Sequence, residues 1–148
     1  MVWGGKTTTQ KLELVVIRGT LNAQRYIQDV LEPVVIPFIN HRRDVIYQQD
    51  NARPHVARIT MDFLRQNNVN LMEWPALSPD LSPIEHVWDE LGRQLRRRLA
   101  RPETLQQLED AIMEEWANIP VDVLARNIHS MRRRCRAVIN ANGGQTRY

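Results

Sequence analysis

Apolar residues are arranged in two ways along the first half of the chain. Four stretches rich in β-branched and aromatic residues predict short strands, at residues 1–3, 12–17, 44–50 and 69–74. Between them, apolar residues three or four positions apart predict two helices. The first covers residues 22–31, is capped by Asn22, and is broken or bent near Pro33; the second covers residues 54–65 and ends at Asn67. The residues expected to face inward on the second helix are Val56, Ile59, Phe63 and Thr60.

The C-terminal part of the chain is predicted to be helical. A proline-rich segment, residues 75–83, is unsuited to a helix or a central strand. After it, apolar residues recur at helical spacing in three segments, 84–95, 105–116 and 124–138, and Gly143 with Gly144 ends the last of them. Alternating strands and helices followed by a helical third predict an α/β fold with one mixed sheet. A length of 148 residues fits a single domain over residues 1–148.

The basic residues are unusual in kind and place. The net charge is only +3, and of the 20 basic residues all but Lys6 and Lys11 are arginine. Two dense arginine runs lie at residues 93–98 and 132–136. Because arginine favours bidentate phosphate contacts, binding of a polyanion is one interpretation. The other is that both runs are solvated helix faces, balanced by an acidic helix at residues 103–115.

Other classes of protein are disfavoured. The single cysteine, Cys135, excludes an internal disulfide and a thiolate zinc cluster. No apolar run approaches the ~18 residues of a membrane span. The polar sequence that follows Met1 lacks the pattern of a signal peptide.

Two carboxylates stand at positions suited to chemistry. Asp50 lies where a predicted strand ends, the edge of an open α/β sheet at which ligands usually bind, although an aspartate there is also common as a turn former or helix cap. Glu85 completes the sequence Ser82-Pro83-Ile84-Glu85, which predicts a capping box at the start of a helix. Taken one at a time, both residues have a sufficient structural explanation. Their spacing gives further information, because 34 residues separate Asp50 from Glu85.

The chain resembles the DDE catalytic domain of Tc1/mariner-type (Tc1-like) transposases, the branch with thirty-four residues between its second and third acidic ligands. The matching segments are Val-Trp-Gly-Gly at residues 2–5, Gly-Thr-Leu-Asn-Ala-Gln-Arg-Tyr at 19–26, Gln-Gln-Asp-Asn-Ala-Arg-Pro-His at 48–55, Trp-Pro at 74–75, Ser-Pro-Asp-Leu-Ser-Pro-Ile-Glu-His-Val-Trp-Asp-Glu-Leu at 78–91, Glu-Trp at 115–116 and Ala-Asn-Gly-Gly-Gln-Thr-Arg-Tyr at 141–148. Their common order and spacing, over nearly the whole chain, carry the resemblance.

The resemblance implies an RNase H-like mixed sheet flanked by helices, and Mg²⁺- or Mn²⁺-dependent cleavage and joining of DNA ends. Asp50 and Glu85 fall on the second and third catalytic, metal-binding acids of the family. It further implies transposon-end DNA as substrate, a homodimer or pairing with an intact transposase, and a nuclear location. Contacts with DNA are expected from Arg53, His55, Arg96, Arg97 and Arg98. For Arg53 and His55, a plain role in the first turn of a helix is the alternative.

The resemblance also indicates what lies outside this chain. The family's first catalytic aspartate is on the central first strand, upstream of Val-Trp-Gly-Gly, and a helix-turn-helix DNA-binding region lies further upstream. We therefore expect a chain that starts in the second strand, a two-ion site formed only in the complete domain, and an inactive fragment. Glu13 and Asp80 do not match the missing aspartate. Without the first strand, two sheet edges stay unpaired, so that either the fold is marginal or the polypeptide is longer. A non-enzymatic DNA-binding remnant and a transposase-pairing module are the alternative functions.

Overall fold

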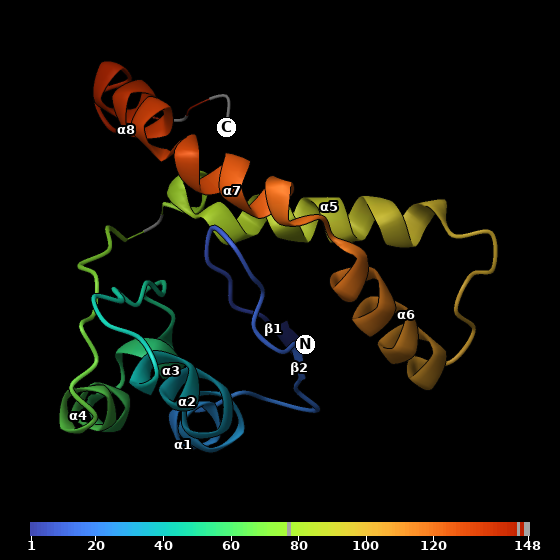
Figure 1. Ribbon diagram of the computed structural model, residues 1–148, viewed down its shortest axis with the longest axis horizontal. Helices are drawn as coiled ribbons and strands as arrows, with labels where there is room; N and C mark the ends of the chain where they lie inside the picture. The colour runs from blue at the N-terminus through green and yellow to red at the C-terminus, as the bar shows by residue number, and fades with distance from the viewer. Residues whose placement is uncertain (77, 145, 147–148) are drawn as a thin grey trace. The chain divides into compact units, whose positions relative to one another are not determined.

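The computed structural model describes residues 1–76, 78–144 and 146 (Figure 1). The last positions of the 141–148 motif, 145 and 147–148, lie outside the described residues. The chain divides into two compact units. The first unit consists of Met1–Gly4 and Val15–Leu77, and the second of Gly5–Leu14 and Ser78–Tyr148.

Short extended segments open the first unit. Strand β1 (Val2–Trp3) pairs antiparallel with β2 (Val15–Val16), with Val2 opposite Val16. The predicted strands at 44–50 and 69–74 are reduced to one parallel bridge between Tyr47 and Leu71. There the Tyr47 N–H donates to the carbonyl of Asn70 at 2.8 Å, and the Met72 N–H donates to the carbonyl of Tyr47 at 2.8 Å. Both antiparallel and parallel pairing occur, but the strands are shorter than predicted. The β-propensity of these residues favours an extended backbone, but it does not provide a neighbouring strand with which that backbone can form hydrogen bonds.

One helical run follows, built from α1 (Ala23–Tyr26), a π-helical segment η1 (Ile27–Val35) and α2 (Ile36–Asn40). Its start is confirmed, since the Asn22 side chain accepts a hydrogen bond from the Arg25 N–H at 2.9 Å. Of the predicted break or bend near Pro33, the break does not occur, because the helical run continues through this residue. Pro33 lies inside the π-helical segment, whose wider turn accommodates a residue that lacks an N–H and crowds the preceding turn. The inward face of this run forms the core of the first unit with Ile17 and Leu64.

The second predicted helix is divided into α3 (Arg53–Val56) and α4 (Arg58–Gln66), and ends at Asn67 as expected. Ala57 between them is extended, with φ −58° and ψ 143°. This residue rotates α4 relative to α3, so a single helical period does not run through both. The predicted inward face is therefore wrong in part: Val56 and Ile59 are exposed, Phe63 is partly buried, and Thr60 is fully buried together with Leu64.

In the second unit, residues 5–14 form a hairpin-like loop closed by a bridge between Lys6 and Lys11, and helices joined by loops make up most of residues 78–144. A 3₁₀ turn, η2 (Pro79–Leu81), precedes α5 (Pro83–Arg97) and α6 (Leu105–Asn118). The Lys11 ammonium donates to three carbonyls at the end of α6, those of Trp116 at 2.5 Å, Ala117 at 2.8 Å and Ile119 at 2.7 Å. A cation at a helix C-terminus satisfies carbonyls that lack partners inside the helix.

The last predicted helix is divided into α7 (Val121–His129) and α8 (Met131–Asn140). The change of direction at Ser130 alters which residues face inward. Cys135 is exposed, whereas Arg134, from the second arginine run, is buried. Its guanidinium donates to Ser130 Oγ at 2.9 Å and to the carbonyl of Asp80 at 3.3 Å, which makes its burial tolerable. Gly143, at φ +79°, follows the end of α8 as predicted.

None of the helices in the described part of the chain is both long and apolar enough to cross a membrane.

The pH dependence of stability should carry a contribution from Lys6. Burial, and secondarily the Arg134 charge, lower the pKa of Lys6 from 10.5 to about 8. Between those two pH values the unfolded chain binds more protons than the folded chain, so this contribution to the free energy of unfolding rises with pH. We expect Lys6→Met to remove that rise, measured by urea unfolding between about pH 7.5 and 9.5. Equal pH slopes for the parent and the variant would contradict it.

Candidate active site

Asp50 occupies a turn between the 45–49 segment and α3. Its Oδ1 accepts the Ala52 N–H at 3.0 Å and a hydrogen bond from His55 Nδ1 at 2.5 Å. The Asp50 side chain is nevertheless 62% exposed, whereas that of His55 is only 15% exposed. The turn-forming role of Asp50 is thus present in the structure, and one edge of its carboxylate still faces solvent.

A buried polar network supports this turn from behind. The Tyr26 hydroxyl donates to Gln49 Oε1 at 2.9 Å and lies 2.8 Å from the hydroxyl of Tyr47. Gln49 Nε2 in turn donates to the main-chain carbonyl of His55 at 3.2 Å. The Tyr26 ring packs on the His55 ring, with centroids 4.3 Å apart and planes tilted by 37°. Residues from α1, from the 45–49 segment and from α3 therefore meet directly behind Asp50.

Both tyrosines in this network stay neutral over the ordinary pH range. Burial raises the pKa of Tyr26 well above 10, and the neighbouring Tyr47 raises it further. Burial likewise raises the pKa of Tyr47 to about 12, with a smaller contribution from the Asp50 charge. Their hydroxyls act as fixed hydrogen-bonding groups. Sequence reasoning missed Tyr26, Tyr47 and Gln49, since no local pattern indicates that these three side chains meet.

Glu85 lies in the first turn of α5, in the second unit, and is exposed. The helix starts at Pro83 as predicted, but the capping box is wrong, because the Ser82 side chain makes no capping hydrogen bond. A capping box forms instead at the start of α6, between Thr104 and Gln107. Glu85 therefore lies in the first turn of a helix that the Ser82 side chain does not cap.

The donor chemistry of Asp50 and Glu85 suits a hard cation, because Mg²⁺ prefers carboxylate oxygens. Within residues 1–76, 78–144 and 146, no three His, Cys, Asp or Glu side chains gather closely enough to hold one ion. Asp50 and Glu85 belong to different units. Their assignment as metal ligands stays a prediction.

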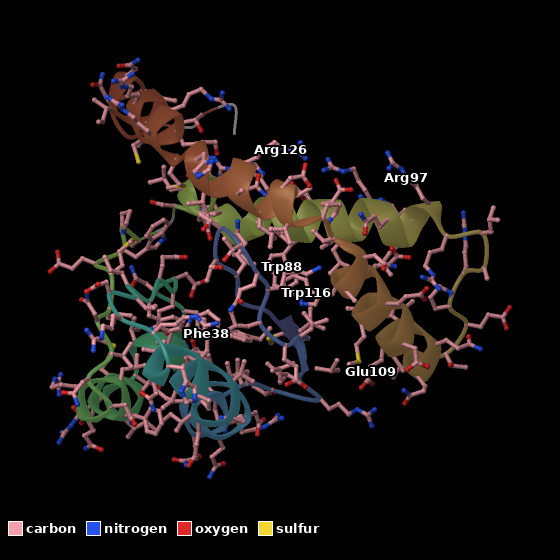
Figure 2. The ribbon with its side chains drawn as sticks, viewed as in Figure 1. Phe38, Trp88, Arg97, Glu109, Trp116 and Arg126 are labelled. Atoms are coloured by element: carbon pink, nitrogen blue, oxygen red, sulfur yellow. The ribbon has the colours of Figure 1, made fainter. Side chains whose placement is uncertain are left out.

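The predicted DNA-contacting arginines differ in their surroundings. Arg53, at the start of α3, and Arg96 and Arg97, at the end of α5, are exposed. Figure 2 shows Arg97 projecting away from the helix. Arg98 is instead bound to two carboxylates of α6, at 2.9 Å from Glu114 and 2.5 Å from Glu115, and these hydrogen bonds raise its pKa.

Comparison with known proteins identifies a matching family and related transposases. A family described as DDE superfamily endonuclease matches residues 1–109. The Tcb1 transposase of Caenorhabditis briggsae is 41% identical over 152 residues, covering 100% of this chain and 54% of that protein. The chain spans about half the length of the curated relatives it matches.

Solved structures of the Mos1 mariner transposase of Drosophila mauritiana share the fold. Its catalytic domain with raltegravir and Mg matches with a TM-score of 0.83 at 23% identity, over 98% of this chain and 76% of that one. The Mos1 paired-end complex with the left transposon end matches with a TM-score of 0.82, also at 23% identity, over 96% of this chain and 43% of that one. The predicted α/β, RNase H-like fold is thereby confirmed. The chain belongs to the DDE superfamily of endonucleases, with Tc1/mariner-type transposases as its relatives.

Proposed function

We propose that this chain is the catalytic part of a transposase that cuts DNA at transposon ends and joins those ends to a new site, using Mg²⁺ or Mn²⁺. One observation carries the proposal: in a chain of the DDE family, the Asp50 carboxylate is fixed through Oδ1 while its side chain remains exposed. A carboxylate held on one side and open on the other is a suitable ligand for a divalent cation. Homodimerisation or pairing with an intact transposase, and a nuclear location, belong to the same proposal.

In this proposal Asp50 and Glu85 hold the ions. Two bound divalent cations would activate the attacking oxygen and stabilise the leaving oxygen of a phosphodiester. The protein contributes ligands set on short, well-defined elements, a turn leading into α3 for Asp50 and the first turn of α5 for Glu85. His55 acts by restraining the Asp50 carboxylate, and the exposed Arg53 of α3 is available for a phosphate.

A plasmid-nicking assay tests the proposal. We expect no appreciable nicking by the 148-residue chain with Mg²⁺ or Mn²⁺, because two carboxylates hold one ion weakly and leave a second site unformed. Joining an upstream strand that carries a third aspartate should confer metal-dependent nicking. Robust nicking by the 148-residue chain itself, lost in Asp50→Asn, would contradict the need for a third ligand. Absence of nicking in every longer, folded version would count against the proposed function.

A second candidate, DNA binding without catalysis, is favoured by the exposure of Arg96 and Arg97. We expect weak, non-specific duplex binding. If each arginine neutralises one phosphate, the double substitution Arg96→Ala/Arg97→Ala should make the log–log dependence of affinity on salt shallower by about 1.8. Titration of a fluorescent duplex over a range of salt concentrations measures this slope.

Arg98→Ala is the matched control for that experiment. Arg98 pairs with Glu114 and Glu115, so its loss should lower the unfolding temperature while leaving the salt slope unchanged. If the double variant binds with the affinity and slope of the parent, this end of α5 is only a solvated helix face.

A further inference from the structure

We infer that His55, Tyr26 and Gln49 are positioning residues that determine which oxygen of Asp50 is presented to a divalent cation. This inference rests on the proposed function of Asp50. Its starting point is that the two carboxylate oxygens are not equivalent. Oδ1 accepts hydrogen bonds from the Ala52 N–H and from His55 Nδ1, while Oδ2 has no hydrogen-bond partner in the described part of the chain. Asp50 would therefore bind an ion through Oδ2 alone.

His55 can fix Oδ1 only if its own position is fixed, and the structure restrains it at two points. Its ring packs against Tyr26 at a centroid distance of 4.3 Å. Its main-chain carbonyl accepts the Gln49 Nε2–H at 3.2 Å. The Tyr26 hydroxyl also donates to Gln49 Oε1 at 2.9 Å, so the two residues that restrain His55 are hydrogen-bonded to each other. Tyr26 and Gln49 are both buried, so neither can reach a substrate, and any effect they have on Asp50 acts through His55.

Because the network is buried, its polar groups cannot exchange their hydrogen-bond partners for water. Unpaired polar groups in a buried setting are costly, so Tyr26 and Gln49 are held to the partners that they have. The tilted packing of the Tyr26 ring against the His55 ring restricts rotation of the imidazole, and Nδ1 is thereby kept toward Asp50. An ordinary residue in the first turn of a helix requires none of these contacts, which distinguishes His55 from the plain structural alternative.

The advantage for ion binding follows from the geometry that Mg²⁺ requires. Mg²⁺ takes near-ideal octahedral coordination, usually with one oxygen from each of one or two carboxylates and several waters. A carboxylate whose second oxygen is already hydrogen-bonded is predisposed to single-oxygen binding and loses less rotational freedom on binding. Removal of such an outer partner typically lowers metal affinity 10–100-fold.

Mn²⁺ binding to the 148-residue chain tests the inference without any measurement of cleavage. Paramagnetic broadening of the Ala52 amide signal, followed during a Mn²⁺ titration, reports an ion bound at Asp50. We expect His55→Ala to weaken binding by about 10–100-fold. His55→Asn, whose side-chain amide nitrogen replaces Nδ1 as donor, should recover most of the loss. Tyr26→Phe retains the ring but loses the hydroxyl bond to Gln49, and should give an intermediate loss.

Two further measurements complete the experiment. His41→Ala, an exposed histidine at the end of α2, is the matched control and should bind Mn²⁺ as the parent does. Without metal, long-range proton–nitrogen spectra of the imidazole rings should show a proton on Nδ1 of His55. A role for His55 in folding alone would predict equal losses for His55→Ala and His55→Asn.

The outcomes separate this inference from the proposal on which it rests. If Asp50→Asn weakens Mn²⁺ binding but His55→Ala does not, Asp50 is a ligand that needs no positioning and the inference is wrong. Equal losses for His55→Ala and His55→Asn would also overturn it. If Asp50→Asn leaves the broadening of Ala52 unchanged, Asp50 is not a metal ligand, and both the inference and the proposed metal role fail.

Discussion

Asp50→Asn and Glu85→Gln are each expected to abolish metal-dependent cleavage in a polypeptide that joins this chain to an upstream strand bearing a third carboxylate. Each change keeps the size of the side chain but removes the negative charge that attracts the ions. We expect at least a 100-fold loss of the nicking rate, since even the loss of a residue that only supports a ligand lowers affinity or activity 10–100-fold. Plasmid nicking with Mg²⁺ and with Mn²⁺ measures the loss.

Thermal unfolding is the control for these two variants. Asparagine retains an Oδ1 that accepts the Ala52 N–H and the His55 Nδ1–H, so the turn around Asp50 should persist. Glu85 is exposed in the first turn of α5, where glutamine is well tolerated. Unfolding temperatures should therefore stay close to that of the parent. If Glu85→Gln remains active, Glu85 is an ordinary residue of a first helical turn and its assignment as a ligand is wrong.

Trp116→Ala is expected to give a large loss of stability in the second unit. Trp116 is only 5% exposed, and its ring stacks on Trp88 with centroids 5.2 Å apart and planes tilted by 28° (Figure 2). Its indole N–H donates to the carbonyl of Leu12 at 3.1 Å, which joins α6 to the 5–14 loop. Removing the ring eliminates a buried contact and leaves a cavity, for which we expect a loss of about 3–5 kcal/mol in the free energy of unfolding. Urea unfolding followed by circular dichroism measures it.

Two substitutions define the source of that loss. Trp116→Phe retains an aromatic ring but leaves the Leu12 carbonyl without its donor, so we expect a smaller loss, about 1–3 kcal/mol. Leu99→Ala changes a fully exposed apolar residue of the same unit, and should stay within about 0.5 kcal/mol of the parent. A loss of under about 1 kcal/mol for Trp116→Ala would mean that the two tryptophans contribute little to this core.

Local sequence signals identified the family and many of the helix boundaries in this chain. Asn22 caps the first helix, Pro83 begins α5, and Gly143 follows α8, each as predicted. Each of these features depends on residues within one helical turn of each other. Asn22 offers a side-chain oxygen to an unpaired N–H, Pro83 has a fixed φ that suits a helix start, and Gly143 tolerates a positive φ. The spacing of Asp50 and Glu85 belongs to the same kind of information, since it is read along the chain and requires no knowledge of contacts.

Tertiary structure alone decided which side chains meet and which faces are buried. The extended Ala57 shifts the helical phase between α3 and α4, so that Val56 and Ile59 are exposed. The junction at Ser130 shifts it between α7 and α8, so that Arg134 is buried in place of Cys135. His55 and Tyr26, 29 positions apart, lie in contact and support Asp50 from behind. Such outcomes depend on the balance between burying a polar group and finding it a partner elsewhere in the chain. A periodicity read over one or two helical turns contains no information about that distant partner, and this is why the sequence indicated Asp50 but not the residues that hold it.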